Sequence, residues 1–398
     1  MKDRVIIVGA GPVGLVMAML LADREIPVVL LEAEGAVNDD LRASTFHPPT
    51  LDMLAPFGIA QQLLEQGLIC PHWQIRMHPG GENAVFDLSV ITDATDHPYR
   101  LQCEQAKLAR IVADCLGGND LVDLRFNSPV IGLNQTGDRV AVEIAEPSGA
   151  PGAVIEGRFV IGADGAGSFV RQALGLEFKG STYPETTVLV STTFPFEEHI
   201  MGLSNVNYCW SPGGNFSLLR LKEFWRCSLY YDPDLSFAAA IADDRVQAQL
   251  TEIHPNGTRF EIVDRRPYRV HQRMVDDFRQ GRVMLVGDAA HVNSPSGGMG
   301  LNGGIHDAFN LAEKLSAVWQ GADLDTLDHY TRQRRPIVEQ AIAQQADRNR
   351  KRMTEKDPAA RARSLAEMQN IAATPALARD HLLKSSMIHG LRRAEAIQ

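Results

Sequence analysis

The residues best suited to chemistry lie in a glycine-rich stretch that follows a short apolar segment, Val283–Val286. Asp288 ends that segment, and a loop of Ser, Pro and Gly leads into a helix that is expected to begin near Gly298. Glycines let the backbone approach a ligand closely, and a helix start offers unpaired N–H groups and a positive dipole end. The stretch would therefore suit an electron-rich ring that carries negative charge. From the glycines alone, an ordinary strand–loop–helix turn fits equally well.

A second stretch with the same potential opens the chain. The apolar segment Val5–Val8 predicts a buried strand, and Gly9, Gly11 and Gly14 follow it at the spacing of a dinucleotide-binding turn. In that turn the first glycine allows the tight bend, the second leaves room for a pyrophosphate, and the third permits close packing of the next helix. A lone G-x-G-x-x-G is a weak signal, but strand, glycines and helix together predict a nucleotide site.

An acid at the end of the next strand strengthens that prediction. The apolar segment 27–31 ends at Glu32, where a carboxylate can accept hydrogen bonds from the ribose hydroxyls of adenosine. A carboxylate there would repel a 2′-phosphate, so the site suits FAD or NAD. The uncharged run Val5–Ala22 approaches the length of a membrane span, but its glycines and proline stand where the nucleotide motif needs them. We therefore expect a buried strand and helix.

A third segment, GADGAGSFVR at Gly162–Arg171, repeats this arrangement in the middle of the chain. Asp164 ends a strand-like run that starts at Arg158, and Gly165 opens the turn into the helix that carries Arg171. Small residues there would let the backbone meet a phosphate. Alone this segment fits a routine β–α turn, and its place between the other two favours a shared nucleotide site.

Together, GAGPVG with Glu32, GADGAGSFVR and GDAAHVNSPSGGMGLNGG (Gly287–Gly304) resemble the single-component FAD-dependent aromatic hydroxylases, the flavoprotein monooxygenases typified by para-hydroxybenzoate hydroxylase. The resemblance covers most of residues 1–345 and rests on the order and spacing of the motifs. It implies that the first motif holds the ADP part of FAD, the second lies near the pyrophosphate and helps NAD(P)H engage, and the acid of the third binds the ribityl chain. The cofactor-binding residues expected on this basis are Gly9, Gly11, Pro12, Val13, Gly14, Glu32, Ala33, Arg42, Gln105, Val130, Asp164, Gly165, Asp288, Pro295, Gly298, Met299, Gly300, Leu301 and Asn302.

The resemblance also implies a reaction. NADH or NADPH reduces the bound FAD, O₂ adds to give a flavin C4a-hydroperoxide, and its distal oxygen passes to a phenolic or related aromatic substrate. The protein places the ring, helps to ionise the phenol and excludes water. Arg220, Tyr230 and Pro295 are the candidate catalytic residues. A flavin-dependent oxidoreductase of the same fold without oxygen insertion and a non-catalytic FAD-binding protein remain alternatives, whereas a plain NAD dehydrogenase would leave the third motif without a purpose.

Individual loop residues carry weaker signals. Arg42 resembles the family's loop arginine, which would bind phosphate oxygens through paired donors, and a surface arginine is the alternative. Gln105, expected just ahead of a helix at Lys107–Leu116, matches a glutamine that contacts FAD, and Val130 would lie near the adenine. His47 precedes a proline at an expected helix start, where capping or packing explains it as well as proton transfer does.

These residues need a scaffold, and the pattern predicts an α/β fold: a Rossmann-like FAD-binding domain with an inserted β-rich substrate domain and C-terminal helices. The expected ranges are 1–75, 100–179 and 275–345 for the FAD-binding domain, 76–99 and 180–274 for the substrate domain, and 346–398 for the C-terminal helical segment. Further helices are expected at 305–319 and 326–353. The segment 357–398 has apolar residues at helical spacing and could cap the fold or form a dimer contact.

Strands of the substrate domain are expected at 187–194, 205–210, 216–221 and 225–231. Alternation places Trp225, Cys227, Leu229 and Tyr231 on one face of the last strand and the residues between them on the other. One face of this sheet should cover the flavin ring, although an aromatic on a strand is more often part of the core or the surface. The candidate lining residues are Tyr208, Trp210, Arg220 and Tyr230.

Composition narrows the class of partner. The 398-residue chain carries a formal net charge of -10, which argues against a general nucleic-acid binder. Its five cysteines are odd in number and widely spaced, which is typical of reduced thiols in the cytoplasm. No signal peptide, membrane span or metal-ligand spacing is expected. Composition thus indicates a cytoplasmic protein, and the resemblance implies an enzyme that acts on a small aromatic substrate with O₂ and NADH or NADPH. A homodimer is a further prediction.

Overall fold

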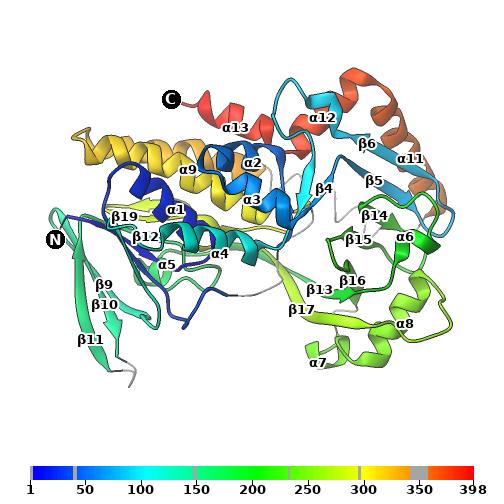
Figure 1. The fold of residues 1–398 in the computed structure, drawn as a ribbon, viewed down its shortest axis with the longest axis horizontal. Helices are drawn as coiled ribbons and strands as arrows, with labels where there is room; N and C mark the ends of the chain where they lie inside the picture. Colours follow the sequence, from blue (N-terminus) through cyan, green and yellow to red (C-terminus); the bar gives the residue numbers. More distant parts are fainter. Residues whose placement is uncertain (1–2, 39–42, 147–149, 232–233, 295–296, 341–356) are drawn as a thin grey trace.

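The computed structural model describes residues 3–38, 43–146, 150–231, 234–294, 297–340 and 357–398. A parallel sheet with flanking helices lies beside a larger, mainly antiparallel sheet, and both are built from segments that are far apart in the sequence (Figure 1). This arrangement confirms the predicted α/β class, with a Rossmann-like part and a β-rich part. The domain boundaries given above remain predictions.

The Rossmann-like part is organised on a six-stranded sheet in the order β18-β19-β12-β1-β2-β8. The five strands from β19 to β8 run parallel, and β18 is antiparallel to β19. All four residues of β1 are buried, because helices pack on one face of this sheet and the antiparallel strands within residues 130–157 pack on the other. The strands are Arg279–Gln280 (β18), Val283–Leu285 (β19), Phe159–Gly162 (β12), Val5–Val8 (β1), Val28–Leu31 (β2) and Val122–Arg125 (β8).

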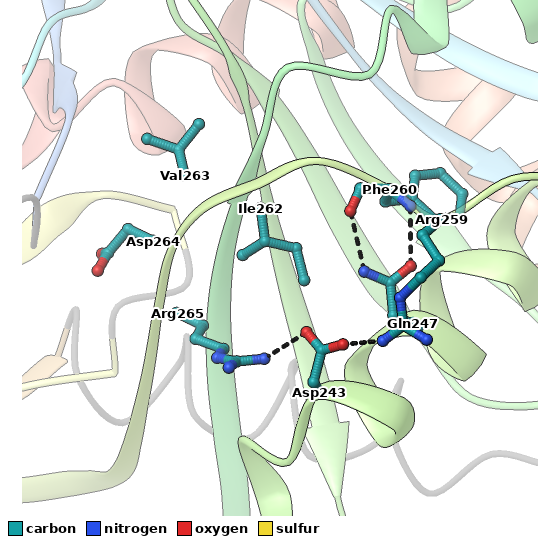
Figure 2. Close-up of a pocket in the computed structure, with 8 residues that line it drawn as sticks. All are labelled: Asp243, Gln247, Arg259, Phe260, Ile262, Val263, Asp264 and Arg265. Carbon is teal, nitrogen blue, oxygen red and sulfur yellow. Dashed lines mark hydrogen bonds and ion pairs between the residues drawn. The ribbon is translucent and has the colours of Figure 1, made fainter.

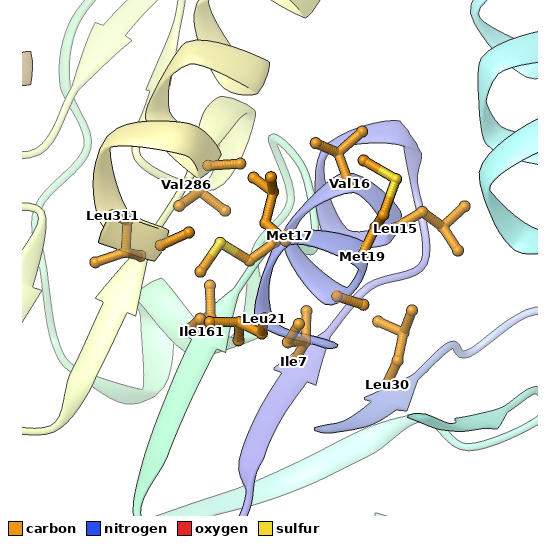
Figure 3. Packing of buried hydrophobic residues seen from close by; sticks show 14 of the residues in the cluster. Ile7, Leu15, Val16, Met17, Met19, Leu21, Leu30, Ile161, Val286 and Leu311 are labelled. Carbon is orange, nitrogen blue, oxygen red and sulfur yellow. The ribbon is translucent and has the colours of Figure 1, made fainter. Parts of the chain in front are cut away.

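Two helices that start at glycine turns pack together on this sheet. Helix α1, Pro12–Asp23, contacts helix α9, Met299–Trp319, and also helix α4, Gln105–Leu116. In Figure 3 the side chains of Met17 and Leu21 on α1 lie over the strands that carry Ile7 and Ile161, and Leu311 of α9 packs nearby. An uncharged α1 therefore forms part of the core. Helix α9 begins directly after Gly298, as the glycines predicted, because Gly298 in the left-handed region (φ 68°) turns the chain into the helix, which then continues through the predicted segment 305–319.

No helix within the described residues combines the length and the apolar character that a bilayer crossing requires.

The larger sheet has eight strands in the order β20-β17-β13-β16-β15-β14-β5-β6, of which only β14 and β5 pair in parallel. Its inner strands match the predicted ones closely, and the alternation prediction is confirmed because Trp225, Cys227, Leu229 and Tyr231 all lie in one buried cluster. The strands are His291–Val292 (β20), Ile262–Met274 (β17), Lys179–Thr192 (β13), Trp225–Tyr231 (β16), Phe216–Arg220 (β15), Val206–Trp210 (β14), His72–Met77 (β5) and Asn83–Asp87 (β6).

Two long strands connect the sheets. β13 (14 residues) and β17 (13 residues) pair antiparallel from Lys179 opposite Met274 to Thr192 opposite Ile262. The sequence predicted only the distal part of β13, at 187–194, and missed β17. The reason is that most residues of β17 are charged or polar and all of them are half-buried or exposed, so the strand lacks the apolar signature of a core strand.

Smaller elements complete the fold. A three-stranded sheet, β3-β7-β4, lies next to the start of α9, and a second one, β11-β10-β9, extends from the Rossmann-like part (Figure 1). The strands of these two small sheets are Thr45–Phe46 (β3), Arg100–Gln102 (β7), Leu68–Cys70 (β4), Pro151–Gly157 (β11), Arg139–Ala145 (β10) and Val130–Thr136 (β9). Residues 328–340 are helical, and residues 341–353 of the helix predicted at 326–353 lie outside the described residues. The short helices are Pro48–Leu54 (α2), Ile59–Gln66 (α3), Phe169–Ala173 (α5), Phe196–His199 (α6), Phe237–Ala240 (α7) and Asp243–Ile253 (α8), with 3₁₀ turns at Ala55–Phe57 (η1), Leu88–Ile91 (η2), Gly287–Ala289 (η3) and Leu324–Leu327 (η4).

The C-terminal helices α11 (Pro358–Ala373), α12 (Pro375–Ser385) and α13 (Ile388–Glu395) pack on the far edge of the larger sheet. Leu365, Met368, Leu382 and Ile388 are buried there against residues of β5, β6 and β14. Of the two roles considered for this segment, the structure shows that it caps the fold.

Candidate functional site

Three loops meet at one edge of the six-stranded sheet. β19, β12 and β1 are neighbours and run parallel, so the glycine motifs that follow them lie side by side. Gly9 sits against Ala163, because a Cβ on Gly9 would lie 2.6 Å from the Ala163 carbonyl oxygen. Val13 reaches the third loop, since a Cβ on Gly304 would lie 2.6 Å from its Cγ2. Segments near residues 9, 164 and 288 therefore converge, as the sequence predicted.

The glycines of the first motif have different reasons to be glycine. Gly9 has φ 100°, which disfavours any other residue, and a Cβ on Gly14 would lie 1.9 Å from the Gly9 carbonyl oxygen. A Cβ on Gly11, by contrast, would meet nothing within 4 Å. Gly11 caps α1 without a side-chain hydrogen bond, and Pro12 and Val13 follow it in the first turn. The first and third glycines shape the turn, while the second leaves open space beside the helix N-terminus.

Glu32 closes this turn from the adjacent strand. Its Oε2 accepts a hydrogen bond from the Ala10 N–H at 2.7 Å, and its Oε1 accepts one from the Glu34 N–H at 3.0 Å. Ala33 beside it is exposed. The Glu32 carbonyl oxygen accepts a hydrogen bond from the Ser128 N–H at 2.8 Å, which brings the half-buried Val130 to the same end of the sheet. The structure thus collects the residues predicted for the adenosine end.

Asp164 organises the second loop. Its carboxylate accepts hydrogen bonds from the Ser168 hydroxyl at 2.5 Å and the Val170 N–H at 3.0 Å, and Gly165 beside it has φ 74°. Burial raises the pKa of Asp164, although these hydrogen bonds partly offset the effect. Ser168 in turn caps helix α5 through the Arg171 N–H at 3.0 Å. The side chain of Asp164 holds the loop in shape and leaves backbone groups for a ligand.

The third loop exposes its acid and presents a helix start. Asp288 lies in η3 and is exposed, next to the buried Gly287 and Ala289. Gly298 caps α9 with no side-chain hydrogen bond, and Met299, Gly300 and Leu301 form the first turn. The N–H groups of this turn are therefore available to an acceptor.

Asn302, predicted to bind the cofactor as part of the helix start, uses its side chain to join two segments. Its Nδ2 donates hydrogen bonds to the carbonyl oxygens of Thr45 at 2.8 Å and Gly298 at 2.6 Å, and its Oδ1 accepts one from the His47 N–H at 2.9 Å. The side chain is fully buried. Asn302 therefore fastens the segment 45–47 to the start of α9.

Two predicted cofactor-binding residues, Arg42 and Pro295, lie outside the described residues. Gln105 is the first residue of α4 rather than a loop residue, and its N–H donates a hydrogen bond to the Ala43 carbonyl oxygen at 2.9 Å. This contact places Gln105 beside the segment that leads into β3.

A buried ionic cluster that the sequence did not predict supports the third loop. Asp307 of α9 accepts hydrogen bonds from His291 Nε2 and from Arg334 Nε, both at 2.7 Å, and from the Gly287 N–H at 3.1 Å. Burial alone would raise the pKa of Asp307, but His291 and Arg334 lower it to about 2. The one sequence signal for this cluster was the position of Asp307, an acid within an otherwise largely apolar helix. The cluster ties the loop after β19 to α9 and to the helix at 328–340.

Two further histidines are buried and neutral next to this cluster. Burial and the charge of Arg334 lower the pKa of His306 to about 3, and its Nε2 lies 2.9 Å from the Thr50 hydroxyl. Burial and the charge of Arg100 lower the pKa of His47 to about 3. His47 Nε2 lies 2.7 Å from the Gly297 carbonyl oxygen, which can only accept, so the proton is on Nε2. His47 is therefore no proton carrier near neutral pH, and packing explains it better than proton transfer.

One face of the larger sheet carries several polar side chains from neighbouring strands. Thr187 pairs with Tyr230 on one side and with Tyr268 on the other, so these three side chains share a face. Arg226, four residues before Tyr230 on β16, lies on the same face and is fully buried. Burial lowers the pKa of Arg226 to about 10, with Glu104 acting in the opposite sense. Arg226 stays charged at neutral pH and lies near the residue that caps α4, a proximity that the sequence gave no means to predict.

Arg220 lies on the other face of the same sheet. It pairs with Trp225 across β15 and β16, and Trp225 belongs to the buried cluster covered by α8. Arg220 Nη2 lies 3.3 Å from Glu197 Oε1, and Trp225 Nε1 donates a hydrogen bond to the same carboxylate. Arg220 and Tyr230, both predicted to be catalytic, are therefore not brought together.

A surface pocket of about 460 Å³ lies away from the three loops. It is lined by residues of α8 and of β17 with the segment before it, including Asp243, Gln247 and Arg265 (Figure 2). Asp243 forms ion pairs with Arg259 and Arg265, so the charges of this pocket are already matched. None of the predicted site residues lines it.

Comparison with known proteins gives consistent matches. A family model described as FAD binding domain matches residues 2–345. Para-nitrophenol 4-monooxygenase of Pseudomonas sp. (strain WBC-3) is 34% identical over 397 residues, which cover 99% of this chain and 98% of that protein. The 6-hydroxy-3-succinoylpyridine 3-monooxygenase of Pseudomonas putida (strain DSM 28022 / S16) is 36% identical over 360 residues, covering 90% and 91%. The crystal structure of p-nitrophenol 4-monooxygenase from Pseudomonas putida DLL-E4 matches with a TM-score of 0.90 at 34% identity and covers 98% of both chains.

Proposed function

Because the chain belongs to the family of FAD-dependent aromatic monooxygenases, with the FAD-binding domain at residues 2–345, we propose that it hydroxylates a small phenolic or hydroxypyridine ring with O₂ and NADH or NADPH. FAD is its cofactor and monooxygenation its reaction class. The observation that supports the detailed proposal is the convergence of the three loops at one sheet edge.

The residues at these loops fit an extended dinucleotide. The open space beside Gly11 and the uncapped N-terminus of α1 suit a pyrophosphate, and the Glu32 carboxylate suits ribose hydroxyls. Asp288 is exposed where a ribityl chain would pass, and the uncapped turn after Gly298 offers N–H donors to the ring. We assign FAD binding to these residues, with Asp164 as the side chain that shapes the middle loop.

Bound FAD would supply electron transfer from the nicotinamide and the reaction with O₂. The residues of this chain bind, orient and shield. The first turn of α9 places backbone N–H groups and a positive dipole end where negative charge would gather on a reduced ring. Asn302 and the Asp307 cluster hold this turn, so the donors are fixed before a ligand arrives. The polar sheet face with Tyr230 and Tyr268 would cover the other side of the substrate.

The names of the relatives suggest the position that is hydroxylated. In para-nitrophenol 4-monooxygenase and 6-hydroxy-3-succinoylpyridine 3-monooxygenase, the position named lies para to the ring hydroxyl and carries a substituent. We propose the same relation for this protein: a ring hydroxyl at one end and a substituted carbon opposite it as the site of attack.

The test measures oxidation of NADH and of NADPH by the purified flavoprotein with para-substituted phenols and hydroxypyridines, followed by product mass after reaction in isotopically labelled O₂. We expect a compound that accelerates oxidation and gains one labelled oxygen. Acceleration that yields only hydrogen peroxide, for every compound tried, would contradict oxygen insertion.

We also propose a cytoplasmic location and a homodimer. All five cysteines are free thiols, which suits a reducing compartment. The C-terminal helices bury Leu365, Met368, Leu382 and Ile388 within the chain, so these four residues are not available to a dimer contact. Light scattering of the holoenzyme would measure its mass, and a monomer at all concentrations would remove the dimer from the proposal.

A further inference from the structure

Arg100 is a buried cation that the described residues provide with no carboxylate partner. Its side chain is 3% exposed, and no Asp or Glu of the described ranges forms an ion pair with it. Its Nη1 donates a hydrogen bond to the Tyr208 hydroxyl at 3.3 Å, and its Nε is buried without any hydrogen-bond partner. An isolated buried charge is costly unless something neutralises it.

The direction of Arg100 follows from its strand. Arg100 and Gln102 are two residues apart on β7, so their side chains lie on the same face. The Gln102 side chain exchanges hydrogen bonds with the Thr45 hydroxyl at about 3.0 Å, and Thr45 packs so closely on Gly298 that a Cβ there would lie 2.7 Å from its own. Arg100 therefore lies two residues along β7 from Gln102, which contacts Thr45 beside the start of α9.

The neighbours of Arg100 are suited to an aromatic ring. Its guanidinium lies 4.9 Å from the Trp73 ring centroid, and the Trp73 and Tyr208 rings meet edge to face with centroids 5.9 Å apart. Tyr208 lies on the polar face of the large sheet, since it pairs with Ser217, which pairs with Ser228 of β16. His47 adds an unpaired Nδ1 but no charge, so Arg100 is the cation of this group.

We propose that Arg100 binds an anionic oxygen of the aromatic substrate, either an ionised ring hydroxyl or a nitro or carboxylate oxygen of the para substituent. The Tyr208 oxygen accepts from Arg100, so its own proton is available as a second donor to the same group. This inference rests on the proposed function and names its specificity determinant. The anionic group of the substrate then serves as the partner of the buried Arg100 guanidinium.

The test titrates oxidised holoenzyme with benzoate, 4-nitrophenol, phenol and the neutral analogue benzamide, and follows the flavin absorbance. The variants are Arg100→Gln, Arg100→Lys and Tyr208→Phe. Arg76→Gln is the matched control, because Arg76 is 4% exposed, also has buried nitrogens without partners, and lies on the opposite face, one residue after the Ile75 that pairs with Tyr208. Loss of a charge-assisted hydrogen bond predicts that Arg100→Gln weakens binding of the anionic ligand by about tenfold or more, with partial recovery in Arg100→Lys.

The readouts separate the two proposals. Wild-type enzyme that binds none of the aromatics would contradict the proposed function itself. Wild-type binding of anions that Arg100→Gln leaves unchanged, or that Arg100→Gln and Arg76→Gln weaken equally, would overturn the role of Arg100 alone. Loss of FAD from Arg100→Gln would assign the cation to the flavin instead, and if that variant does not fold, Arg100→Lys and Tyr208→Phe decide by the same comparison. Preference for benzoate over phenol, at a pH where phenol is not ionised, would identify a carboxylate rather than the ring hydroxyl as the group that Arg100 binds.

Discussion

Arg171 joins the second loop to the third, because its Nη1 donates a hydrogen bond to the carbonyl oxygen of Ala289 at 3.0 Å. Its Nη2 donates another to the Ala166 carbonyl oxygen at 2.7 Å, and the guanidinium lies 3.9 Å from the Phe178 ring centroid. One side chain thus holds two loops that are more than a hundred residues apart in the sequence, and these are the loops to which we assign the middle of the cofactor.

Replacing Arg171 should therefore loosen the cofactor site as well as the fold. We expect Arg171→Met to lower the free energy of unfolding by about 2–4 kcal/mol, because the buried carbonyl oxygen of Ala289 and the part-buried one of Ala166 lose a charged donor. Thermal unfolding with and without added FAD measures the effect. Arg171→Lys is the control, since it keeps a charge but cannot reach both carbonyl oxygens at once. Equal stability of all three proteins would show that the link carries no energy.

The glycines of the first motif should separate folding from cofactor binding. Gly11→Ala places a Cβ in open space at φ -68°, so the apo-protein should keep its stability to within about 1 kcal/mol while FAD affinity falls. Gly14→Ala drives a Cβ to 1.9 Å from the Gly9 carbonyl oxygen and should destabilise the apo-protein itself. Flavin fluorescence titration and chemical denaturation measure the two quantities. The assignment of Gly11 to the pyrophosphate fails if Gly11→Ala binds FAD as tightly as wild type.

Glu32 should contribute through its charge and through the turn it closes. Glu32→Ala removes the acceptor of the Ala10 N–H and the proposed partner of the ribose, so FAD affinity should fall by roughly tenfold to a hundredfold. Glu32→Gln keeps one acceptor oxygen and should lose less. Titration of apo-protein with FAD gives the dissociation constants, and identical values for all three proteins would argue against adenosine binding here.

Two buried neutral histidines should make the protein sensitive to mild acid. His47 and His306 titrate near 6.5 when unfolded, whereas burial lowers the pKa of each to about 3 in the folded chain. As the pH falls below 6.5, the unfolded chain binds protons that the folded chain does not. The free energy of unfolding should then decrease by about 1.4 kcal/mol per pH unit for each histidine.

Urea denaturation at a series of pH values on either side of 6.5 measures this slope. His306→Gln should make the slope shallower, and exchange of an exposed histidine such as His72 is the control. Asp307 affects stability at lower pH than the histidines do. Its pKa is lowered from 3.8 to about 2, so the stabilisation is complete above pH 3.8 and is lost as the pH falls through about 2. A wild-type stability that is flat between neutral pH and about 4 would contradict the buried neutral state of both histidines.

Arg220 and Tyr230 should give different phenotypes, since they lie on opposite faces of the sheet. Arg220→Gln loses the contact with Glu197 and should change stability by about 1 kcal/mol or less, with turnover preserved. Tyr230→Phe should raise KM for the aromatic substrate more than it changes the melting temperature. Steady-state kinetics with calorimetry on both variants tests this, and loss of turnover in Arg220→Gln would restore it as a catalytic candidate.

The sequence predicted the nucleotide-binding half well because its signals are local. Around Gly9 and around Asp164, a buried strand, a glycine turn and an acid lie within a short stretch of sequence, so each local structure can be predicted from neighbouring residues. The convergence of the loops followed because parallel neighbouring strands end at the same sheet edge. The sequence singled out Asn302 only because it belongs to the third motif. Its hydrogen bonds to residues 45–47 depend on a contact between segments more than 250 residues apart.

The substrate side was harder to predict because its signals are not local. Alternation along β16 separated the two faces of the strand correctly but could not say which one Arg220 of the neighbouring strand would join. Arg100 stands in a three-residue strand with no motif around it, and only the folded structure shows a buried cation beside Tyr208. The Asp307 cluster combines residues from three separate segments, so no spacing in the sequence reveals it.

The pairing of β13 with β17 has a consequence for how this family can diversify. Lys179 and Met274 face each other across the pair, so the chain leaves the nucleotide-binding half and returns to it at a single point. The stretch between these two residues also contacts the rest of the chain through the pairing of β14 with β5 and through the packing of Val206 and Trp210 against the C-terminal helices. An exchange of that whole stretch between relatives in one recombination event would replace Tyr208 and Tyr230, while Arg100 and the loops assigned to the flavin would stay.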